Sequence, residues 1–250
     1  MSIQNINFGC EFEYSTDFNT LSPIIKKSIR DIYGDKKLIV KEQHYLSTNN
    51  KVRWHLKTDV TTASELTTPI SKLENLTSII KIVKLIKKNN VKITNNDSIH
   101  VHVSVKGIPI NQIICLWLLI EHTIIKCFKK HRRNNQHCEK LNTKKNKIIE
   151  KVFPDSFAVS MNHHAIVSTA YHPDRETVEF RVCHGTLDTD FIKNWIVFCL
   201  LFVERAKNID ILKIKKRNVS EINTPEQIIQ ELNIKNKSVQ NFLKQNFNLY

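Results

Sequence analysis

The chain has 250 residues, enough for one sizeable hydrophobic core. With 41% hydrophobic and 25% charged residues, its composition is typical of a soluble globular protein. The formal net charge of +14 allows a polyanionic partner such as nucleic acid or a phosphate-bearing substrate, but the lysines are spread along the whole chain. Charge alone therefore does not decide the function.

Targeting and membrane segments are not expected. The chain does not begin with a basic and then apolar signal segment, and its most apolar run, Ile113 to Ile125, is interrupted by Glu121 and His122. We therefore expect no export, no membrane span and a cytoplasmic location. The cysteines form no CxxC pair, so reduced and mostly buried thiols are expected. They are Cys10, Cys115, Cys127, Cys138, Cys183 and Cys199.

The predicted elements alternate along the chain. Strand-like runs rich in β-branched or aromatic residues lie at 5–14, 52–57, 63–67, 99–105, 165–170 and 177–183. Helical periodicity lies at 20–33, 71–89, 109–131 and 188–207. This order predicts an α+β fold with an antiparallel or mixed sheet that carries helices on one face.

The last forty residues differ in composition from the rest. They are rich in Asn, Lys and Gln, with weak apolar spacing, and one capped helix is predicted at Thr224 to Leu232 with Pro225 in its first turn. We expect residues 1–210 to form the main domain. Residues 211–250 would be a helical appendage, within that domain or peripheral to it.

Three predicted strands separate ionisable from apolar side chains. Successive side chains of a strand point to opposite faces, so "NFGCEFEY", "DSIHVHVSV" and "ETVEFRVC" are each apolar on one face and ionisable on the other. The ionisable faces carry Glu11 and Glu13, His100 and His102, and Glu179 and Arg181.

A fourth segment, "HLKTDVTTASELTTP", adds Asp59 and Glu65. Carboxylates gathered on one face of a sheet cost free energy unless cations lie between them. Mg²⁺ is the natural candidate, because it prefers oxygen ligands and is usually held by a few carboxylates together with substrate phosphates.

Each pair taken alone has an ordinary interpretation. Two glutamates two residues apart are more often a solvent-facing side of a strand, a single HxH is more often hydrogen-bonded than metal-bound, and a Glu/Arg pair is commonly a surface ion pair. Their repetition on strands that are Phe- and Val-rich on the other face favours a shared site.

The ordered motifs resemble a known family. "FGCEFEY", "WHLKTD", "ASELTTPI", "DSIHVHV", "HRRNNQHCEKL" and "ETVEFRVCHGTLDTDFIKNWI" are similar to the motif set of the amidoligases, members of the glutamine synthetase-like carboxylate–amine ligase superfamily. The match covers about Asn7 to Phe202. The resemblance implies a glutamine synthetase-like catalytic fold within residues 1–210, with a curved, mainly antiparallel sheet and helices packed on its convex face.

The resemblance also implies an activity. Such a protein would be an ATP-grasping carbon–nitrogen ligase that uses ATP and Mg²⁺ to form an amide or isopeptide bond through an acyl phosphate. The metal ligands it implies are Glu11, Glu13, Glu65 and Glu179. It implies ATP binding by Arg132, Arg133, His100, His102 and Arg181, and catalysis by Asp59, Arg181 and Arg133.

Two further sequence features bear on this resemblance. The chain has no GxxxxGK(S/T) loop and only four glycines, which argues against P-loop and Rossmann nucleotide sites. Val60, Thr61 and Thr62 stand where the family commonly has a small turn. The roles of His163, His164 and Arg175 stay open.

Two other functions stay open at this point. His100, His102 and Glu179 could form a two-histidine, one-carboxylate site for iron or zinc. The basic chain could also bind nucleic acid, although aromatic residues are not interleaved with its basic runs. For a ligase, the positive charge would suit an acidic acceptor such as a glutamate-containing peptide or protein tail.

Overall fold

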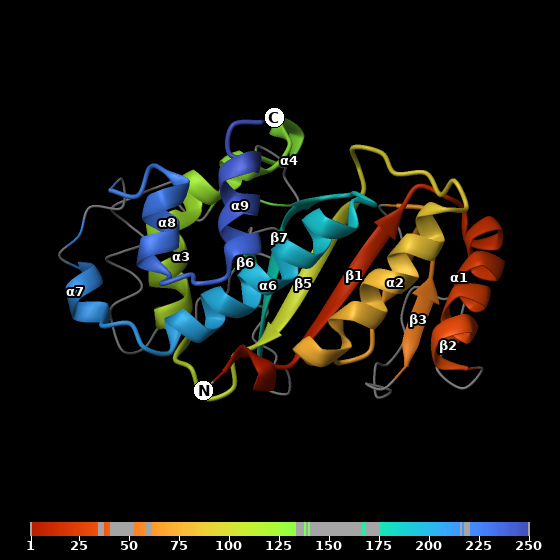
Figure 1. Cartoon of the computed structure of the whole chain (residues 1–250), viewed down its shortest axis with the longest axis horizontal. Coiled ribbons are helices and arrows are strands. Elements are labelled where there is room, and N and C mark those ends of the chain that lie inside the picture. Colours follow the sequence, from red (N-terminus) through yellow and green to blue (C-terminus); the bar gives the residue numbers. More distant parts are fainter. Residues whose placement is uncertain are drawn as a thin grey trace. The chain divides into compact units, whose positions relative to one another are not determined.

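The computed structural model describes residues 2–34, 38–40, 53–58, 62–133, 138, 140, 167–168, 176–215, 217 and 221–249. They belong to two compact units (Figure 1). We call Gln4–Val101 with Cys183–Lys193 the N-terminal unit. Met1–Ile3, His102–Val182 and Asn194–Tyr250 form the C-terminal unit. The boundaries between the units fall inside β5 (Ser98–Ser104) and β7 (Thr177–His184), and also inside η1 (Ile3–Asn5) and α6 (Thr189–Ala206).

The N-terminal unit is built on an open sheet. Its strands lie in the order β2-β3-β4-β1-β5, where β5 enters with its first half. β4 pairs antiparallel with both β3 and β1, whereas β2 and β3 are parallel. The predicted α+β class with a mainly antiparallel sheet is confirmed. The strands are β1 (Phe8–Tyr14), β2 (Leu38–Val40), β3 (Trp54–Lys57), β4 (Ser64–Thr67) and β5 (Ser98–Ser104).

Two helices, α1 (Phe18–Tyr33) and α2 (Leu76–Lys87), pack against each other over one face of this sheet (Figure 1). A short 3-10 turn, η3 (Leu73–Asn75), precedes α2. Asp17 caps α1 by accepting a hydrogen bond from the backbone N–H of Thr20 at 2.9 Å. The buried face of α2 is aliphatic, and that of α1 combines Leu and Ile side chains with Ser22 and Ser28. The alternate residues of β1 on the covered face are also buried. They are Phe8, Cys10, Phe12 and Tyr14.

A close backbone contact fixes the start of β5. Gly185, just after β7, donates its N–H to the carbonyl of Asp97 at 2.7 Å. The Asp97 carboxylate is fully buried and accepts hydrogen bonds from the Ser15 hydroxyl at 2.8 and 2.9 Å and from the backbone N–H of Thr94 at 2.6 Å. The residue before β5, Asp97, is therefore fixed by hydrogen bonds of both its side chain and its backbone.

The C-terminal unit is mostly helical around an aromatic core. The second half of β5 lies beside β7 (Thr177–His184), and β7 pairs antiparallel with β6 (Val167–Ser168). Phe180 of β7 makes edge contacts with Trp117, Trp195 and Phe202, at centroid distances of 5.6 to 6.1 Å. The helices are α3 (Ile110–Ile124), η4 (Ile125–Cys127), α4 (Lys130–Arg133), α6 (Thr189–Ala206), α7 (Ile211–Lys215), α8 (Pro225–Glu231) and α9 (Lys237–Asn246), and η1 (Ile3–Asn5) begins the chain.

The segment Ile110–Cys127, which comprises α3 and η4, is long and apolar enough to cross a membrane by length and composition alone. Most of it is buried inside the structure, which is also what the core helix of a soluble protein would show. The segment is therefore weak evidence for a membrane span.

The helices of the last forty residues pack into the C-terminal unit. α8 contacts α3, and α9 contacts η4. The guanidinium of Arg205 donates to the backbone carbonyl of Glu231 at 2.8 Å, and the hydroxyl of Thr123 donates to the carbonyl of Ile222. Ile228 and Leu243 are fully buried. The domain limit at residue 210 stays a prediction.

Most predicted elements are present within a few residues of their expected bounds. The helix expected at 109–131 ends at Ile124, and η4 and α4 follow it. The sequence analysis missed η1, β2, α7 and α9. All six cysteines are free and buried, as predicted.

The contact between Gly185 and Asp97 gives a test of the fold. A Cβ at Gly185 would lie 2.7 Å from the Asp97 Cβ and 2.9 Å from its carbonyl oxygen. Gly185→Ala should therefore lower the free energy of unfolding by about 1–3 kcal/mol, as overpacking does. Denaturant unfolding measures this loss. Gly9→Ala is the control, because its nearest neighbour would be Thr68 Oγ1 at an ordinary 3.8 Å; equal stability of the two variants would contradict the account.

Candidate functional site

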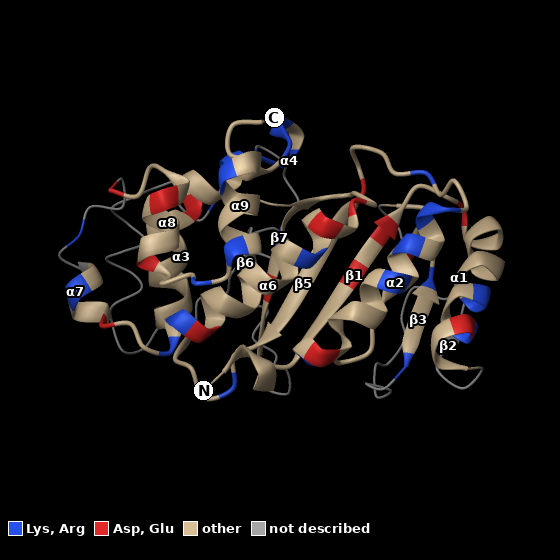
Figure 2. Cartoon of the chain, viewed as in Figure 1, with Lys and Arg blue, Asp and Glu red and all other residues tan. Residues whose placement is uncertain are grey.

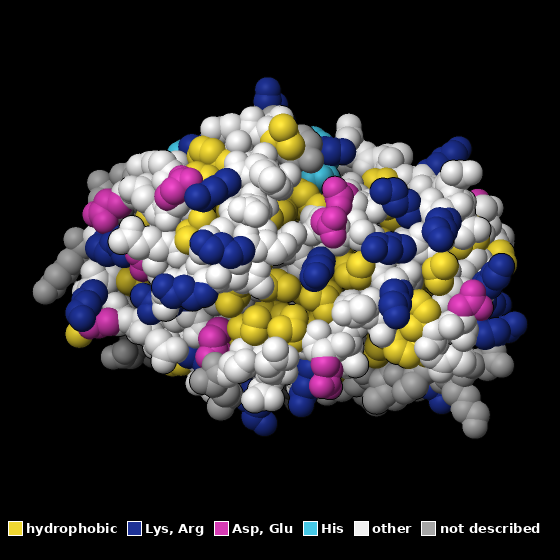
Figure 3. Space-filling model, viewed as in Figure 1, with side chains coloured by type: hydrophobic (Ala, Val, Ile, Leu, Met, Phe, Trp, Pro, Cys, Tyr) yellow, Lys and Arg dark blue, Asp and Glu magenta, His cyan; other side chains and the backbone are white. Residues whose placement is uncertain are grey.

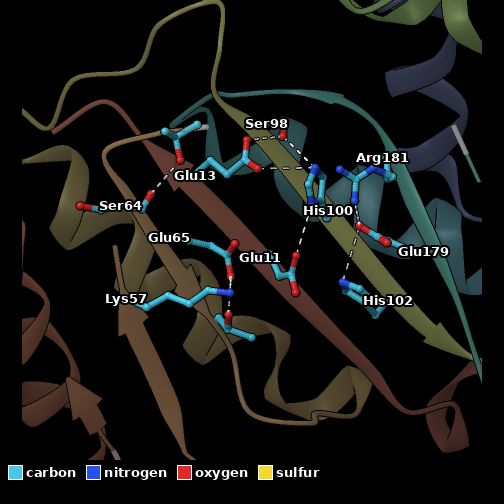
Figure 4. A network of polar contacts seen from close by, with 12 residues as sticks. Glu11, Glu13, Lys57, Ser64, Glu65, Ser98, His100, His102, Glu179 and Arg181 are labelled. Atoms are coloured by element: carbon cyan, nitrogen blue, oxygen red, sulfur yellow. Dashed lines mark hydrogen bonds and ion pairs between the residues drawn. The ribbon is translucent and has the colours of Figure 1, made fainter. Parts of the chain in front are cut away.

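The face of the N-terminal sheet that α1 and α2 do not cover carries polar side chains in rows across the strands (Figure 4). Residues directly opposite each other on antiparallel strands project from the same face. Glu65 of β4 lies opposite Glu13 of β1 on one side and opposite Lys57 of β3 on the other. We call Lys57, Glu65 and Glu13 the first row. The second row consists of His55, Thr67 and Glu11 in the same register.

Glu65 is the most constrained member of the first row. Its side chain is only 7% exposed, and its Oε1 lies 2.9 Å from the ammonium of Lys57. The same oxygen accepts a hydrogen bond from the Thr67 hydroxyl at 3.0 Å. Burial, followed by the negative charge of Glu11, raises the pKa of Glu65 to about 7, although Lys57 acts in the opposite direction.

The first half of β5 adds His100 and Ser98 to this face. The Nδ1 of His100 lies 3.3 Å from Glu11 Oε2, and its Nε2 lies 3.8 Å from Glu13 Oε1. Ser98 donates its hydroxyl to Glu13 Oε2 and lies 2.8 Å from the Nε2 of His100. The imidazole of His100 therefore lies between two carboxylates. Its side chain is only 5% exposed, so little water reaches it.

These residues have the composition of a site for a hard divalent cation. Glu11, Glu13 and Glu65 offer carboxylate oxygens, which Mg²⁺ prefers as ligands. Like charges directly opposite on neighbouring strands are destabilising, so Glu13 and Glu65 favour a cation between them. The donor set of the N-terminal unit therefore fits Mg²⁺.

The C-terminal unit carries a second group of charged side chains. Arg181 of β7 forms an ion pair with Glu179 on the same strand, and His102 Nε2 lies 3.9 Å from Glu179 Oε1. We call Glu179, Arg181 and His102 the β7 group. All three side chains keep some exposure, so an anion or a cation from solvent can reach them.

The two arginines expected to bind phosphate both bind main-chain carbonyls. Arg132 is 2% exposed and donates from Nη2 to the carbonyl of Arg181 at 2.6 Å. Arg133 donates from Nε to Phe128 O at 2.9 Å and from Nη2 to Lys126 O at 3.0 Å. In this arrangement Arg132 ties α4 to β7. The phosphate roles of both residues stay predictions.

Several predicted residues are not placed by the structure. Asp59, His163, His164 and Arg175 lie outside the described residues. Conversely, the sequence analysis missed Lys57 and Ser98 as members of the site. Lys57 alternates with the buried Leu56 in "WHLKTD", but only the strand register shows that it faces Glu65.

The positive charge is distributed over helices of both units (Figure 2). On the face that Figure 3 shows, lysine and arginine side chains stand singly among other side chains. This face therefore gives no support to a continuous surface for nucleic acid.

Comparison with known protein families identifies a family for this chain. A family model described as "Putative amidoligase enzyme" matches residues 4–203, well over half of the chain. A search of curated proteins found no match. The matched segment contains both rows and the β7 group, so the resemblance found in the sequence motifs is confirmed.

The raised pKa of Glu65 predicts a pH dependence of stability. Because its folded pKa of about 7 exceeds its ordinary value of 4.5, the stabilising contribution of Glu65 is complete below the unfolded pKa and is lost as pH rises through 7. The loss is up to about 3 kcal/mol. Glu65→Gln should remove it, so that the variant gains stability over the wild-type protein between about pH 5 and about pH 8.

Denaturant unfolding without divalent cations measures this difference at each pH. Glu74→Gln is the control, since Glu74 lies exposed in η3. A stability difference between Glu65→Gln and wild type that does not change with pH would contradict the assignment.

Proposed function

Because this chain belongs to the amidoligase family, we propose that it is an ATP- and Mg²⁺-dependent ligase that forms an amide or isopeptide bond. An amidoligase takes carboxylate and amine substrates in general. The observation that supports an ATP- and metal-dependent reaction is the first row, where the carboxylates of Glu13 and Glu65 lie directly opposite each other on neighbouring strands. We also propose the glutamine synthetase-like form of the fold, which the mainly antiparallel sheet with α1 and α2 on one face supports.

The reaction divides into two steps. A carboxylate is a poor acylating agent, so an oxygen of the carboxylate substrate first attacks the γ-phosphorus of ATP, and ADP leaves. The amine nitrogen then attacks the carbonyl carbon of the acyl phosphate, the bond to the phosphate oxygen breaks, and the amine loses a proton. The protein contributes positioning and charge stabilisation, which are the main requirements of phosphoryl transfer.

The acidic residues serve as metal ligands in this proposal. Glu11, Glu13 and Glu65 hold Mg²⁺ in the N-terminal unit, and Glu179 is a further ligand of the family motif. The bound ion neutralises negative charge on the phosphoryl oxygens. His100 supports Glu11 and Glu13 through its contacts with both carboxylates.

The β7 group supplies a positive charge for phosphate. Arg181 presents a guanidinium held by Glu179, and a guanidinium matches the geometry of phosphate oxygens. His102 lies near the same carboxylate and would contact phosphate or metal. Arg132 donates a hydrogen bond to the backbone carbonyl of Arg181 and so restrains the backbone position from which the Arg181 side chain extends.

The proton of the amine needs an acceptor. Asp59, which the family motif offers, takes this role in the proposal. The net charge of +14 favours an acidic acceptor, such as a glutamate-containing peptide. A cytoplasmic location is part of the same proposal.

Calorimetric titration with Mg²⁺·ATP tests the proposal. The wild-type protein should bind the nucleotide only when Mg²⁺ is present. Glu13→Gln and Glu179→Gln should each weaken binding by about tenfold or more, because each removes a charged contact. Formation of ADP should then require both a carboxylate and an amine in a substrate screen.

Glu74→Gln again serves as the matched control and should bind as the wild type does. The proposal would be contradicted by nucleotide binding that is independent of Mg²⁺ or unchanged in both glutamine variants. Loss of binding only together with loss of folding, as judged by circular dichroism, would not count as support.

A further inference from the structure

Lys57 ends the first row, and none of the roles above uses it. On β3, Trp54 and Leu56 are buried on the apolar face, so Lys57 projects from the polar face of the sheet. Its side chain is 26% exposed, whereas that of Glu65 is 7% exposed. The ammonium thus lies at the boundary between the buried acids and solvent.

Metal binding would change the electrostatics of this lysine. The Lys57 ammonium lies 2.9 Å from Oε1 of Glu65, and Glu65 is also one of the three carboxylates proposed to hold the divalent cation. With the cation bound, the ion and the Lys57 ammonium would share Glu65 and repel each other at short range.

An anionic ligand would reduce the repulsion between the metal ion and the Lys57 ammonium. The lysine stem is flexible, so its ammonium can leave Glu65 without a movement of β3. A phosphoryl group or a carboxylate next to the metal would give the displaced ammonium a negatively charged partner. Both are present in a reaction that joins ATP, a carboxylate and an amine.

We propose that Lys57 is an anion-binding residue of this site, which pairs with Glu65 without metal and contacts a phosphoryl or carboxylate oxygen of the substrates when the metal holds Glu65. This inference rests on the proposed function for the presence of the metal. It assigns to the "WHLKTD" motif a binding role for its lysine.

The competing role of Lys57 is that of a counter-ion for Glu65 alone. The two roles predict different results for Lys57→Met. A counter-ion competes with the metal, so its removal would leave Mg²⁺ binding unchanged or stronger and would not affect an anion. An anion-binding residue adds a second effect, because its removal weakens the binding of an anion to the Mg²⁺-loaded protein.

The test compares Lys57→Met, Lys57→Gln and Lys57→Arg with the wild-type protein by calorimetry. Mg²⁺ alone is titrated first, and pyrophosphate and glutarate are then titrated separately at saturating Mg²⁺. We expect unchanged or stronger Mg²⁺ binding in Lys57→Met and Lys57→Gln, with about a tenfold loss of affinity for at least one anion. Lys57→Arg should keep part of this affinity. A loss confined to pyrophosphate identifies a phosphoryl partner, and a loss confined to glutarate identifies a carboxylate partner.

Lys81→Met, on the exposed side of α2, is the control for a general loss of positive charge. Anion affinities that match the wild type in both neutral variants, or an equal loss in Lys81→Met, would overturn the role of Lys57 while leaving the proposed function intact. The same holds for a Mg²⁺-loaded wild-type protein that binds neither anion. A wild-type protein that does not bind Mg²⁺ overturns both.

Discussion

The pairing of Glu13 with Glu65 on neighbouring antiparallel strands is the constraint around which the N-terminal unit is arranged. Two carboxylates directly opposite each other destabilise a sheet unless protons or cations compensate their charge. The ammonium of Lys57, the imidazole of His100 and the hydroxyl of Ser98 each contact one of these acids. Such an arrangement costs stability in the absence of a metal and becomes favourable once a cation is bound.

The rest of the unit keeps these groups in register. β1 has buried aromatic and sulfur-containing side chains on the face that α1 and α2 cover, and this burial fixes which residues face the other side. Asp97 is tied to Ser15, Thr94 and Gly185, and the next residue is Ser98, which binds Glu13. A glycine outside the site therefore helps to set the position of Glu13, a proposed metal ligand.

The sequence predicted the faces of the strands but not their register. Alternation along β1 was sufficient to place Glu11 and Glu13 together, because side chains of a strand alternate strictly. No local pattern states which residue of β3 lies opposite Glu65, so the role of Lys57 became visible only with the strand pairing. The family resemblance implied a phosphate role for Arg132, which stays a prediction, and no sequence pattern showed that its buried guanidinium donates to the main chain of Arg181.

Helix α9 shows the same limit of sequence patterns. Its polar surface residues outnumber its apolar ones, so the sequence analysis expected a helical appendage here but located no helix at these residues. The signal that could have found it is the Asn236 cap followed by Val239, Phe242 and Leu243, which share one face at helical spacing. Burial of that face in the C-terminal unit explains why the helix forms despite its weak average hydrophobicity.

The measurement that tests the central claim most directly is the binding of Mn²⁺, a paramagnetic substitute for Mg²⁺, followed by electron paramagnetic resonance. The account predicts that the protein removes the signal of free Mn²⁺ in a saturable manner, that Mg²⁺ restores the signal, and that a Glu13→Gln, Glu65→Gln double variant does not bind the ion. Retention of Mn²⁺ by a folded double variant would show that the paired acids do not form the metal site, and would contradict the account.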